Sequence, residues 1–216
     1  MNTRLVMRPL ALALAAAAAA TTLSACAPLI VGGAMVGGSM MVIDRRTSGA
    51  QVEDEGIELK AGNAVRELAT LGHVSITSYN RQVLLTGEVP AEDDRQRVER
   101  AVRRVENVRS VANELAVAGN SSLSSRSNDL ILTSKVKATF VDAKDLQAPA
   151  IKVVTERATV YLMGRVTERE ATRASDLARS VSGVQRVVRV FEVISEAELA
   201  NLQKATQPSE PASGNR

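Results

Sequence analysis

Reactive and aromatic side chains are scarce in this chain of 216 residues, which has one cysteine, one histidine, no tryptophan, two tyrosines and two phenylalanines. A single cysteine excludes a disulfide within the chain, and a single histidine excludes a metal site with two histidine ligands. So few aromatic rings leave no platform on which the bases of single-stranded nucleic acid could stack. The chain also lacks a phosphate-binding loop ending in Gly-Lys-Ser/Thr and a Gly-rich dinucleotide turn. We therefore expect no enzyme activity, no metal or cofactor and no nucleic-acid partner.

The remaining polar candidates do not form a catalytic set either. His73 precedes a predicted strand beside Gly72, where we expect a surface or turn role. Acidic residues occur in contiguous groups, such as Glu53-Asp54-Glu55 and Glu92-Asp93-Asp94, whereas the carboxylates of a hydrolase converge on one pocket from separate parts of the chain. We expect both groups to be solvated, and a hydrolase is the least favoured function.

The single cysteine, Cys26, follows a leader sequence. Arg4 and Arg8 form a short basic region, and an unbroken apolar run extends from Leu10 to Ala20 before a group of small residues. This order is typical of a secretory signal. The apolar run is about half of the ~20 residues that a helix needs to cross a bilayer, so residues 1–25 are predicted to be a signal peptide and not a membrane-spanning helix.

Leu23-Ser24-Ala25-Cys26 resembles a bacterial lipobox. The resemblance implies that the signal is cut before Cys26, that its thiol receives a diacylglycerol and that its new amino group is acylated, for example with palmitate. The alternatives are an ordinary signal peptide with a chance cysteine, or a buried cysteine. In similar proteobacterial lipoproteins an Asp at the next position retains the protein in the inner membrane, so Ala27 implies export to the outer membrane, facing the periplasm.

Residues 26–51, between the cysteine and the first folded domain, are predicted to be a tether. Residues 28–43 read PLIVGGAMVGGSMMVI, and their two pairs of glycines make a stable helix improbable. The stretch either lies on the lipid or is a linker that happens to be apolar.

The rest of the chain contains an internal repeat. VLLTGEV at residues 83–89 matches VYLMGRV at residues 160–166, at a spacing of 77. Apolar residues then recur at a spacing of 76, with Val105, Val108, Val111, Leu115 and Val117 matching Val181, Val184, Val187, Phe191 and Val193. Between the copies, residues 119–127 are rich in serine and are predicted to be a linker.

Each copy shows the pattern of the same five elements. Alternating apolar residues predict a hairpin of two strands, apolar residues three and four apart predict an amphipathic helix, and a further alternating run predicts a third strand. A helix before the hairpin completes the unit. In the first copy these are a helix over 57–71, strands over 74–77 and 82–89, a helix over 91–106 and a strand over 108–117. The predicted fold class is α+β, with two tandem αββαβ domains, each a three-stranded mixed sheet with two helices on one face and a polar opposite face.

This pattern resembles the BON domain family over residues 52–118 and 128–195. Gly87 and Gly164 occupy the position of the family's glycine inside the second strand, and because such a glycine usually marks a bulge or close packing, we expect structural roles for both. With the lipobox, the resemblance implies an outer-membrane lipoprotein that binds anionic phospholipid, such as phosphatidylglycerol or cardiolipin, and supports outer-membrane integrity. Residues 196–216 are predicted to form a short helix and a disordered tail.

The two domains differ in charge. Residues 52–118 contain 9 basic and 12 acidic residues, a net charge of −3, whereas residues 126–195 contain 12 basic and 8 acidic residues, a net charge of +4. Each basic residue close to an anionic membrane is worth about 1 kcal/mol, so the second domain is the better candidate for lipid contact. The alternative is that this charge only reflects a solvated surface.

The helix predicted over 128–141 is the candidate lipid-binding segment, with Asn128 or Asp129 as its cap. The residues expected to face the sheet recur every four positions and are Leu132, Val136 and Phe140. The residues left to other faces, and expected to bind lipid, are Leu130, Ile131, Ser134, Lys135 and Lys137. An exposed apolar pair with lysines nearby fits a helix in the headgroup region, although no Trp or Tyr is present as an interfacial anchor.

Two alternatives compete with lipid binding. Leu130 and Ile131 could instead pack against the other domain. A function of a different class is a protein-interaction adaptor, in which the two BON domains dock envelope machinery or each other.

Overall fold

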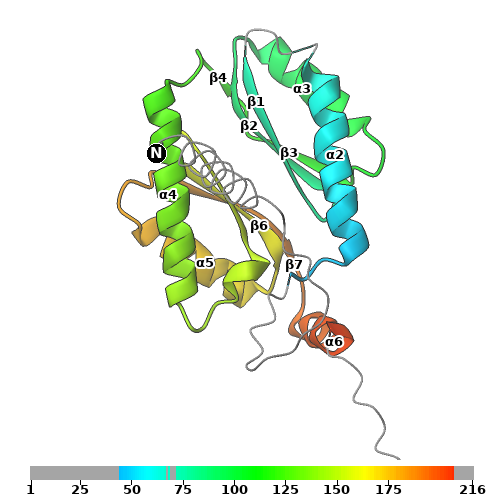
Figure 1. Ribbon diagram of the computed structural model, residues 1–216, viewed down its shortest axis with the longest axis vertical. Helices are drawn as coiled ribbons and strands as arrows, with labels where there is room; N and C mark the ends of the chain where they lie inside the picture. Colours follow the sequence, from blue (N-terminus) through cyan, green and yellow to red (C-terminus); the bar gives the residue numbers. More distant parts are fainter. Residues whose placement is uncertain (1–43, 67, 69–71, 207–216) are drawn as a thin grey trace, which may run out of the picture. The chain divides into compact units, whose positions relative to one another are not determined.

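A computed structural model describes residues 44–66, 68 and 72–206 of the chain (Figure 1). The predicted signal peptide, Cys26 and the Gly-rich stretch at 28–43 lie outside these residues, as does the end of the C-terminal tail. Among the described residues, no helix has the length and apolar character needed to span a bilayer. The described residues belong to one compact unit, which contains a hydrophobic core for each domain.

Both domains have the predicted order of elements. The first consists of α2 (Ser48–Arg66), β1 (His73–Tyr79), β2 (Gln82–Val89), α3 (Glu92–Arg103), β3 (Ser110–Asn113) and β4 (Ala116–Val117). The second consists of α4 (Leu123–Asp142), the short 3-10 helix η2 (Ala148–Ala150), β5 (Lys152–Glu156), β6 (Thr159–Val166), α5 (Glu168–Ser180) and β7 (Arg186–Val193). A last helix, α6 (Glu196–Thr206), follows the second domain where a short helix is predicted.

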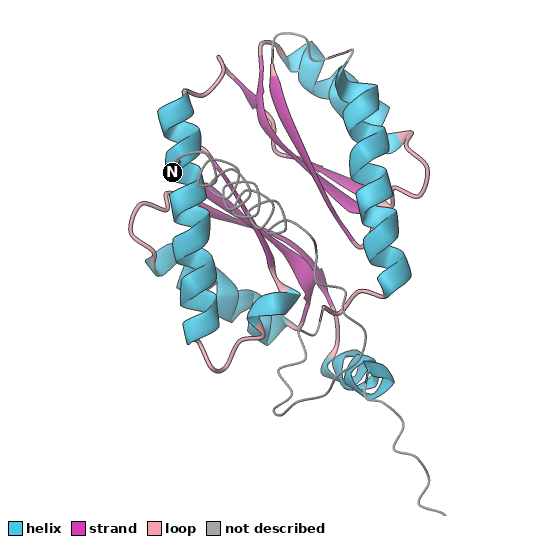
Figure 2. Cartoon of the chain, in the orientation of Figure 1, coloured by secondary structure: helices cyan, strands magenta, loops and turns pink. Residues whose placement is uncertain are grey.

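Each domain has a mixed sheet. β2 pairs with β1 in antiparallel and with β3 and β4 in parallel orientation, and β6 pairs with β5 in antiparallel and with β7 in parallel orientation. Figure 2 shows that α2 and α3 lie on one side of the first sheet and that α4 and α5 lie on one side of the second. The predicted α+β class with tandem αββαβ domains is therefore confirmed.

The third strand of the first domain is interrupted, whereas a continuous strand over 108–117 is predicted. The side-chain oxygen of Asn113 accepts a hydrogen bond from the amide of Leu115 at 3.2 Å. This local turn ends β3 and separates it from β4. β7 in the second domain has no such break and pairs with β6 along its whole length.

The residue-by-residue match between the copies extends to the first helix of each domain, where the sequence predicts a helix without aligning its residues. The core residues of α2 are Ile57, Ala61 and Val65, and those of α4 are Leu132, Val136 and Phe140. Each residue of the first set precedes its counterpart by 75 positions. The buried face predicted for α4 is thus confirmed, and α2 buries residues at the equivalent positions.

A buried aspartate on α2 holds the turn of the hairpin that follows. Asp54 accepts hydrogen bonds at 2.7 Å from the amides of Asn80 and Arg81, whose φ angles of 50° and 65° suit a two-residue hairpin turn. The Ser78 hydroxyl and the Arg46 guanidinium donate to the same carboxylate at 2.7 and 2.8 Å. Burial alone would raise the pKa of Asp54, but these hydrogen bonds outweigh it and lower the pKa. The prediction that Asp54 is solvated is therefore wrong.

Asp129 plays the same role in the second domain. It is 5% exposed and accepts hydrogen bonds at 2.9 and 2.8 Å from the amides of Arg157 and Ala158, whose φ angles of 51° and 56° match those of the first turn. Asp129 lies 75 positions after Asp54, so the repeat includes this contact. The predicted capping of the helix by Asn128 or Asp129 is wrong because the carboxylate is used by the hairpin.

Gly87 and Gly164 lie on β2 and β6 where another segment passes close by. Their φ angles are 111° and 155°, in the region that favours glycine. A Cβ on Gly87 would overlap the carbonyl oxygen of His73, and one on Gly164 would overlap that of Ala150. This close approach of two backbones accounts for a glycine at both positions.

The sheet faces opposite the helices are buried and carry both apolar and polar side chains, whereas a polar face is predicted. Tyr79 and Leu84 of the first sheet form one buried cluster with Tyr161, Met163 and Val190 of the second. The apolar run of each central strand reflects this arrangement, because a strand buried on both faces does not alternate. The two domains therefore contact each other through their sheets.

Candidate functional site

α4 is longer than predicted and includes part of the stretch predicted to be a linker. Its N-cap is Ser122, whose hydroxyl accepts a hydrogen bond from the amide of Ser125 at 3.1 Å. The helix therefore begins at Leu123 and runs for 20 residues, a length of about 30 Å at 1.5 Å per residue. Serines that indicate a linker by composition here begin a helix, because one of them supplies the cap.

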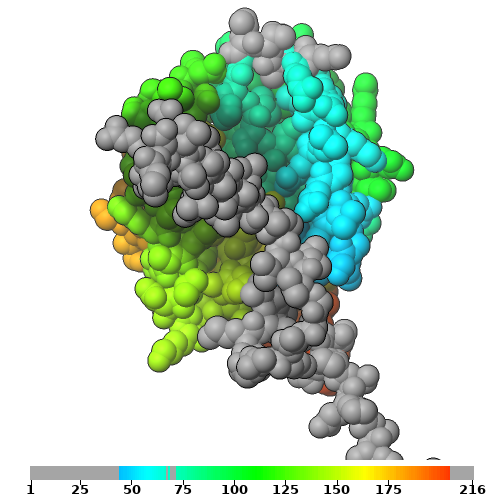
Figure 3. Space-filling view, viewed as in Figure 1, coloured from blue at the N-terminus to red at the C-terminus, as the bar shows by residue number. Residues whose placement is uncertain are grey.

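The five predicted lipid-binding residues all lie on the exposed faces of α4. Leu130 is 70% exposed and Ile131 is 53% exposed, so neither side chain is packed against the other domain. Ser134, Lys135 and Lys137 are exposed as well. The segment that contains α4 is coloured green at the left of Figure 3.

Two further exposed apolar residues extend this surface to both ends of the helix. Leu123 is 81% exposed and Val141 is 73% exposed. At 100° per residue, positions 123, 130, 134, 137 and 141 fall along one line of the helix. We call the residues on this line the outer stripe, and they are Leu123, Leu130, Ser134, Lys137 and Val141. The 3.6-residue period of the helix places Leu123 and Val141 on this line. The sequence could not show this for Leu123, because the helix was predicted to begin only at residue 128.

Hydroxyl groups on this side of α4 are satisfied by the helix itself. Ser127 and Ser134 donate to the carbonyl oxygens of Leu123 and Leu130 at 2.9 and 3.0 Å. Because these hydroxyl groups already donate to the helix backbone, they lose fewer hydrogen bonds when water is removed from this surface. The outer stripe is therefore less costly to dehydrate than its serines suggest.

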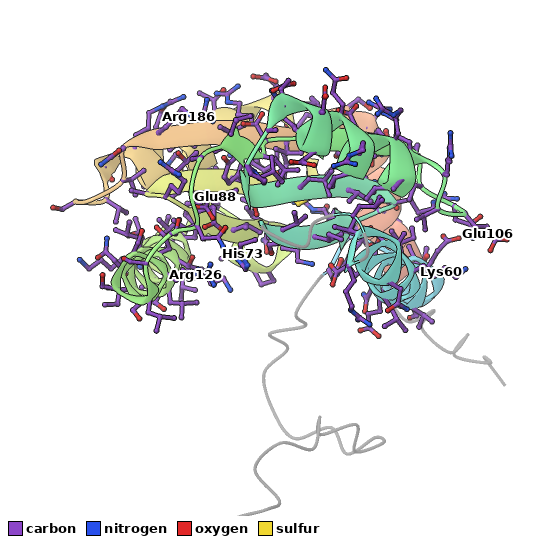
Figure 4. The ribbon with its side chains drawn as sticks, turned by 90° about the horizontal axis from the view of Figure 1, so that it is seen from above. Lys60, His73, Glu88, Glu106, Arg126 and Arg186 are labelled. Carbon is purple, nitrogen blue, oxygen red and sulfur yellow. The ribbon has the colours of Figure 1, made fainter. Side chains whose placement is uncertain are left out.

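The lysines of α4 are free to meet an external anion. Neither Lys135 nor Lys137 forms an ion pair with any residue in the described part of the chain. By contrast, the exposed Lys60 of α2 lies 3.0 Å from Glu106, and the two are labelled in Figure 4. α4 thus presents apolar side chains and uncompensated positive charge on one surface.

The matching surface of α2 has a different character. Subtracting 75 from the five candidate positions on α4 gives Glu55, Gly56, Leu59, Lys60 and Gly62. Leu59 is 68% exposed and Val52 is 70% exposed, so apolar residues are also present there. Glu55 and the two glycines replace the Leu, the Ile and one Lys of α4, and the surface has no net positive charge.

A separate polar cluster lies between β2, the segment before α4 and the turn between β5 and β6. Glu88 is fully buried, and its carboxylate accepts a hydrogen bond from the Ser121 hydroxyl and lies 3.6 Å from the guanidinium of Arg157. His73 and Arg126 lie beside Glu88 in Figure 4. The cluster joins residues of both domains and of the segment between them.

His73 is half-buried in this cluster, at the first position of β1, opposite Glu88. Burial lowers its pKa and the charge of Arg126 lowers it further, while Glu88 opposes both. It is therefore part of a strand and a charged junction, and the predicted surface or turn role is only partly correct. No group of three or more Asp, Glu, His or Cys side chains that could hold a metal ion is present among the described residues.

The last residues of the predicted tether are anchored to the second domain. Arg45 makes two hydrogen bonds of 2.7 Å to the carboxylate of Glu170 and one of 2.8 Å to the carbonyl oxygen of Arg165. The side chains of Arg45 and Glu170 are only 3% and 4% exposed. Since α2 begins soon afterwards at Ser48, the last four residues of the predicted tether over 26–51 are helical.

Comparison with known proteins gives a consistent result. A family model, the BON domain, matches residues 54–119 and 128–195. The outer membrane lipoprotein DolP of Haemophilus influenzae is 38% identical over 176 residues, which cover 80% of this chain and 90% of that protein. A 21 kDa hemolysin of Actinobacillus pleuropneumoniae is 27% identical over 70% of this chain and 80% of that protein. Osmotically-inducible protein Y of Escherichia coli is 28% identical over 53% of this chain and 58% of that protein.

Similarity to solved structures is low. The C-terminal domain of CdsD, from the type III secretion system of Chlamydia trachomatis, is 9% identical with a TM-score of 0.28, over 62% of this chain and 96% of that one. That similarity is too low to inform the fold.

Proposed function

The chain belongs to the BON domain family and is an outer-membrane lipoprotein, and we propose that its second domain binds anionic phospholipid through the exposed surface of α4. The observation that carries this proposal is the outer stripe, together with Ile131 and the two lysines that have no ion pair among the described residues. A helix of this kind lies in the plane of the membrane with its apolar side chains at the boundary between headgroups and acyl chains. Phosphatidylglycerol and cardiolipin are the headgroups we favour.

The expected strength of the contact is modest. Lys135 and Lys137 contribute about 1 kcal/mol each near an anionic surface. A fully buried Leu or Ile contributes about 1.5–3 kcal/mol, and the partial insertion of Leu130 and Ile131 yields a fraction of that. The lipid anchor proposed at Cys26 makes the second contact intramolecular, so that a weak site is still occupied. The proposal needs no catalytic group.

The proposal is tested with the soluble chain from residue 27 onward and vesicles of phosphatidylcholine with or without phosphatidylglycerol. We expect binding that requires phosphatidylglycerol and weakens as salt is added. Ile131→Asp and Lys135→Glu should each weaken binding by about tenfold or more. Lys135→Glu reverses one charge near the surface, which changes the energy by about 2 kcal/mol. Ile131→Asp adds one negative charge, worth about 1 kcal/mol, and removes an apolar side chain from the contact. Flotation or surface plasmon resonance measures the affinity.

The first domain supplies matched controls. Gly56→Asp and Lys60→Glu place the same side chains at the corresponding positions of α2, and we expect vesicle binding to change by less than twofold. If both pairs of variants weaken binding equally, the effect is one of net charge and the assignment to α4 is wrong. Equal binding to neutral and anionic vesicles would also contradict it.

We further propose that this contact supports outer-membrane integrity. Cells that produce only the Ile131→Asp or Lys135→Glu protein should become sensitive to detergents or large antibiotics, as cells without the protein would be. An adaptor that docks envelope machinery is the competing function. It is favoured if a specific protein partner is captured equally well by the wild type and by variants that no longer bind vesicles.

A further inference from the structure

An apolar groove lies beside the C-terminal end of α4, within the second domain. Its volume is about 260 Å³, and it is lined by Lys137, Phe140, Val141, Ala148, Pro149 and Ile151. Phe140 and Ile151 are 1% and 7% exposed and also belong to the hydrophobic core. Val141 is a member of the outer stripe, so the groove continues from the surface to which we assign lipid binding.

The loop that forms the far wall of the groove uses its own hydrogen-bonding groups. The amides of Ala143, Leu146 and Ala150 donate to loop or helix carbonyl oxygens at 3.0–3.3 Å, as does that of Ile151. Pro149 has no amide proton to satisfy. An apolar molecule can therefore lie against this wall without burying an unpaired donor of these residues, which would cost roughly 1–3 kcal/mol.

We propose that this groove receives part of one acyl chain of an anionic phospholipid bound at α4. The inference rests on the proposed function and names the part of the lipid that the groove recognises. A volume of about 260 Å³ is below the ~300 Å³ at which pockets for complete small ligands begin. The groove thus holds a segment of a chain, and the rest of the lipid stays in the bilayer.

Charge identifies the occupant as a lipid. Lys137 is the one polar side chain in the lining, and it has no ion pair in the described part of the chain. A phospholipid places its anionic phosphate a short distance from its apolar chains, which matches a lysine at the rim of an apolar groove. No carboxylate lines the groove, so its chemistry does not favour a cationic side chain of a protein partner.

The test uses the chain from residue 27 onward and dihexanoyl phosphatidylglycerol below its micelle concentration, so that no bilayer is present. We expect saturable binding, with chemical-shift changes at Ala148, Val141 and Ile151 in NMR spectra. Ala148→Phe fills the groove and Val141→Ser removes an apolar rim residue, and each should weaken binding at least fivefold. Val141 is 73% exposed, so Val141→Ser will fold even if Ala148→Phe does not.

Leu123→Ser is the matched control at the other end of the outer stripe. Leu123 is 81% exposed and does not line the groove. This variant should bind the short-chain lipid like the wild type and should bind vesicles more weakly, because it removes apolar surface from the stripe alone.

Three results would overturn the inference. The first is unchanged short-chain binding in Ala148→Phe and Val141→Ser, and the second is equal binding of glycerophosphoglycerol, which has the headgroup without chains. The third is equally tight binding of a neutral short-chain diacylglycerol, which would show that Lys137 selects nothing. In each case vesicle binding that still depends on Ile131 and Lys135 leaves the proposed function intact, whereas loss of that dependence removes both.

Discussion

The first helices of the two domains are alike on their buried faces and unlike on their exposed faces. Both place three apolar residues in the core and one aspartate under the turn of the hairpin, 75 positions apart. Outside, α4 carries Leu130, Ile131 and Lys137 where α2 carries Glu55, Gly56 and Gly62. The inner face is constrained by the hairpin and the core, whereas the outer face is free to change. This difference is the reason why we propose the lipid contact for the second copy of the duplicated scaffold only.

The domains also differ in the hydrogen bonds that hold the hairpin turn and the N-terminus of the second helix. Asp54 accepts hydrogen bonds from four groups and Asp129 from two. The second helix of the second domain has a capping box formed by Thr167 and Glu170, while Ala91 at the N-cap of α3 makes no side-chain cap. Arg45, which precedes the first domain, pairs with the capping box of the second. The segment before α2 is therefore joined to the domain for which we propose lipid binding.

The largest expected effect comes from separating this segment from the second domain. Arg45→Ala leaves the buried carboxylate of Glu170 without its cation, and breaking a buried pair in this way typically costs about 3–5 kcal/mol. Urea denaturation should show a lower free energy of unfolding, and Glu170→Gln added to Arg45→Ala should recover part of it. A loss below about 1 kcal/mol would contradict a pairing that holds the segment in place.

The same pair predicts a dependence on pH. Burial alone would raise the pKa of Glu170, but the hydrogen bonds from Arg45 and from the amide of Thr167 outweigh it and lower the pKa. The pair therefore stabilises the fold above about pH 4.3, the ordinary value for glutamate, and this contribution is lost as the pH falls through the lowered value. Arg45→Ala should flatten this part of the curve of stability against pH.

A smaller effect should separate the two buried aspartates. Asp54→Asn and Asp129→Asn each replace a charged acceptor by an amide whose NH2 group faces a backbone donor. With about 1.5–3 kcal/mol for each hydrogen bond to a charged group, we expect losses of about 3 kcal/mol for Asp54→Asn and about 2 kcal/mol for Asp129→Asn. Equal losses in urea denaturation would show that Ser78 and Arg46 add nothing to the first site.

Much of this comparison could be predicted from residue patterns within one element. The 3.6-residue period identified the buried residues Leu132, Val136 and Phe140 and the exposed residues around Leu130. The match between the copies was high enough in the second strand, and from Val105 to the third strand, to reveal the repeat. It was too low in the first helix, where only the pattern of one aspartate and three apolar residues is shared.

The features that escaped prediction depend on contacts between elements. Asp54 and Asp129 bind a turn that lies more than 25 residues away, and nothing in their own segments distinguishes them from solvated acids. Arg45 is one arginine in a predicted tether, and its partner Glu170 follows 125 residues later. The serines before Leu123 indicated a linker because a cap and a linker have similar composition. The continuous apolar run VYLM in β6 did carry a signal, since it predicts burial on both faces.

The smallest effect, and the most direct test of the comparison, transfers the exposed residues of α4 to α2. Glu55→Leu, Gly56→Ile and Gly62→Lys together are tolerated sterically, because nothing lies within 4 Å of a Cβ at either glycine. Replacing two helical glycines should also raise the stability, by about 0.5–1 kcal/mol each. In a chain whose own site is disabled by Ile131→Asp, we expect the transfer to restore vesicle binding about tenfold. If a folded protein shows no restored binding, the second domain recognises lipid through more than the exposed face of its first helix. The missing part would then be the groove beside Val141, because the transfer does not give this groove to α2.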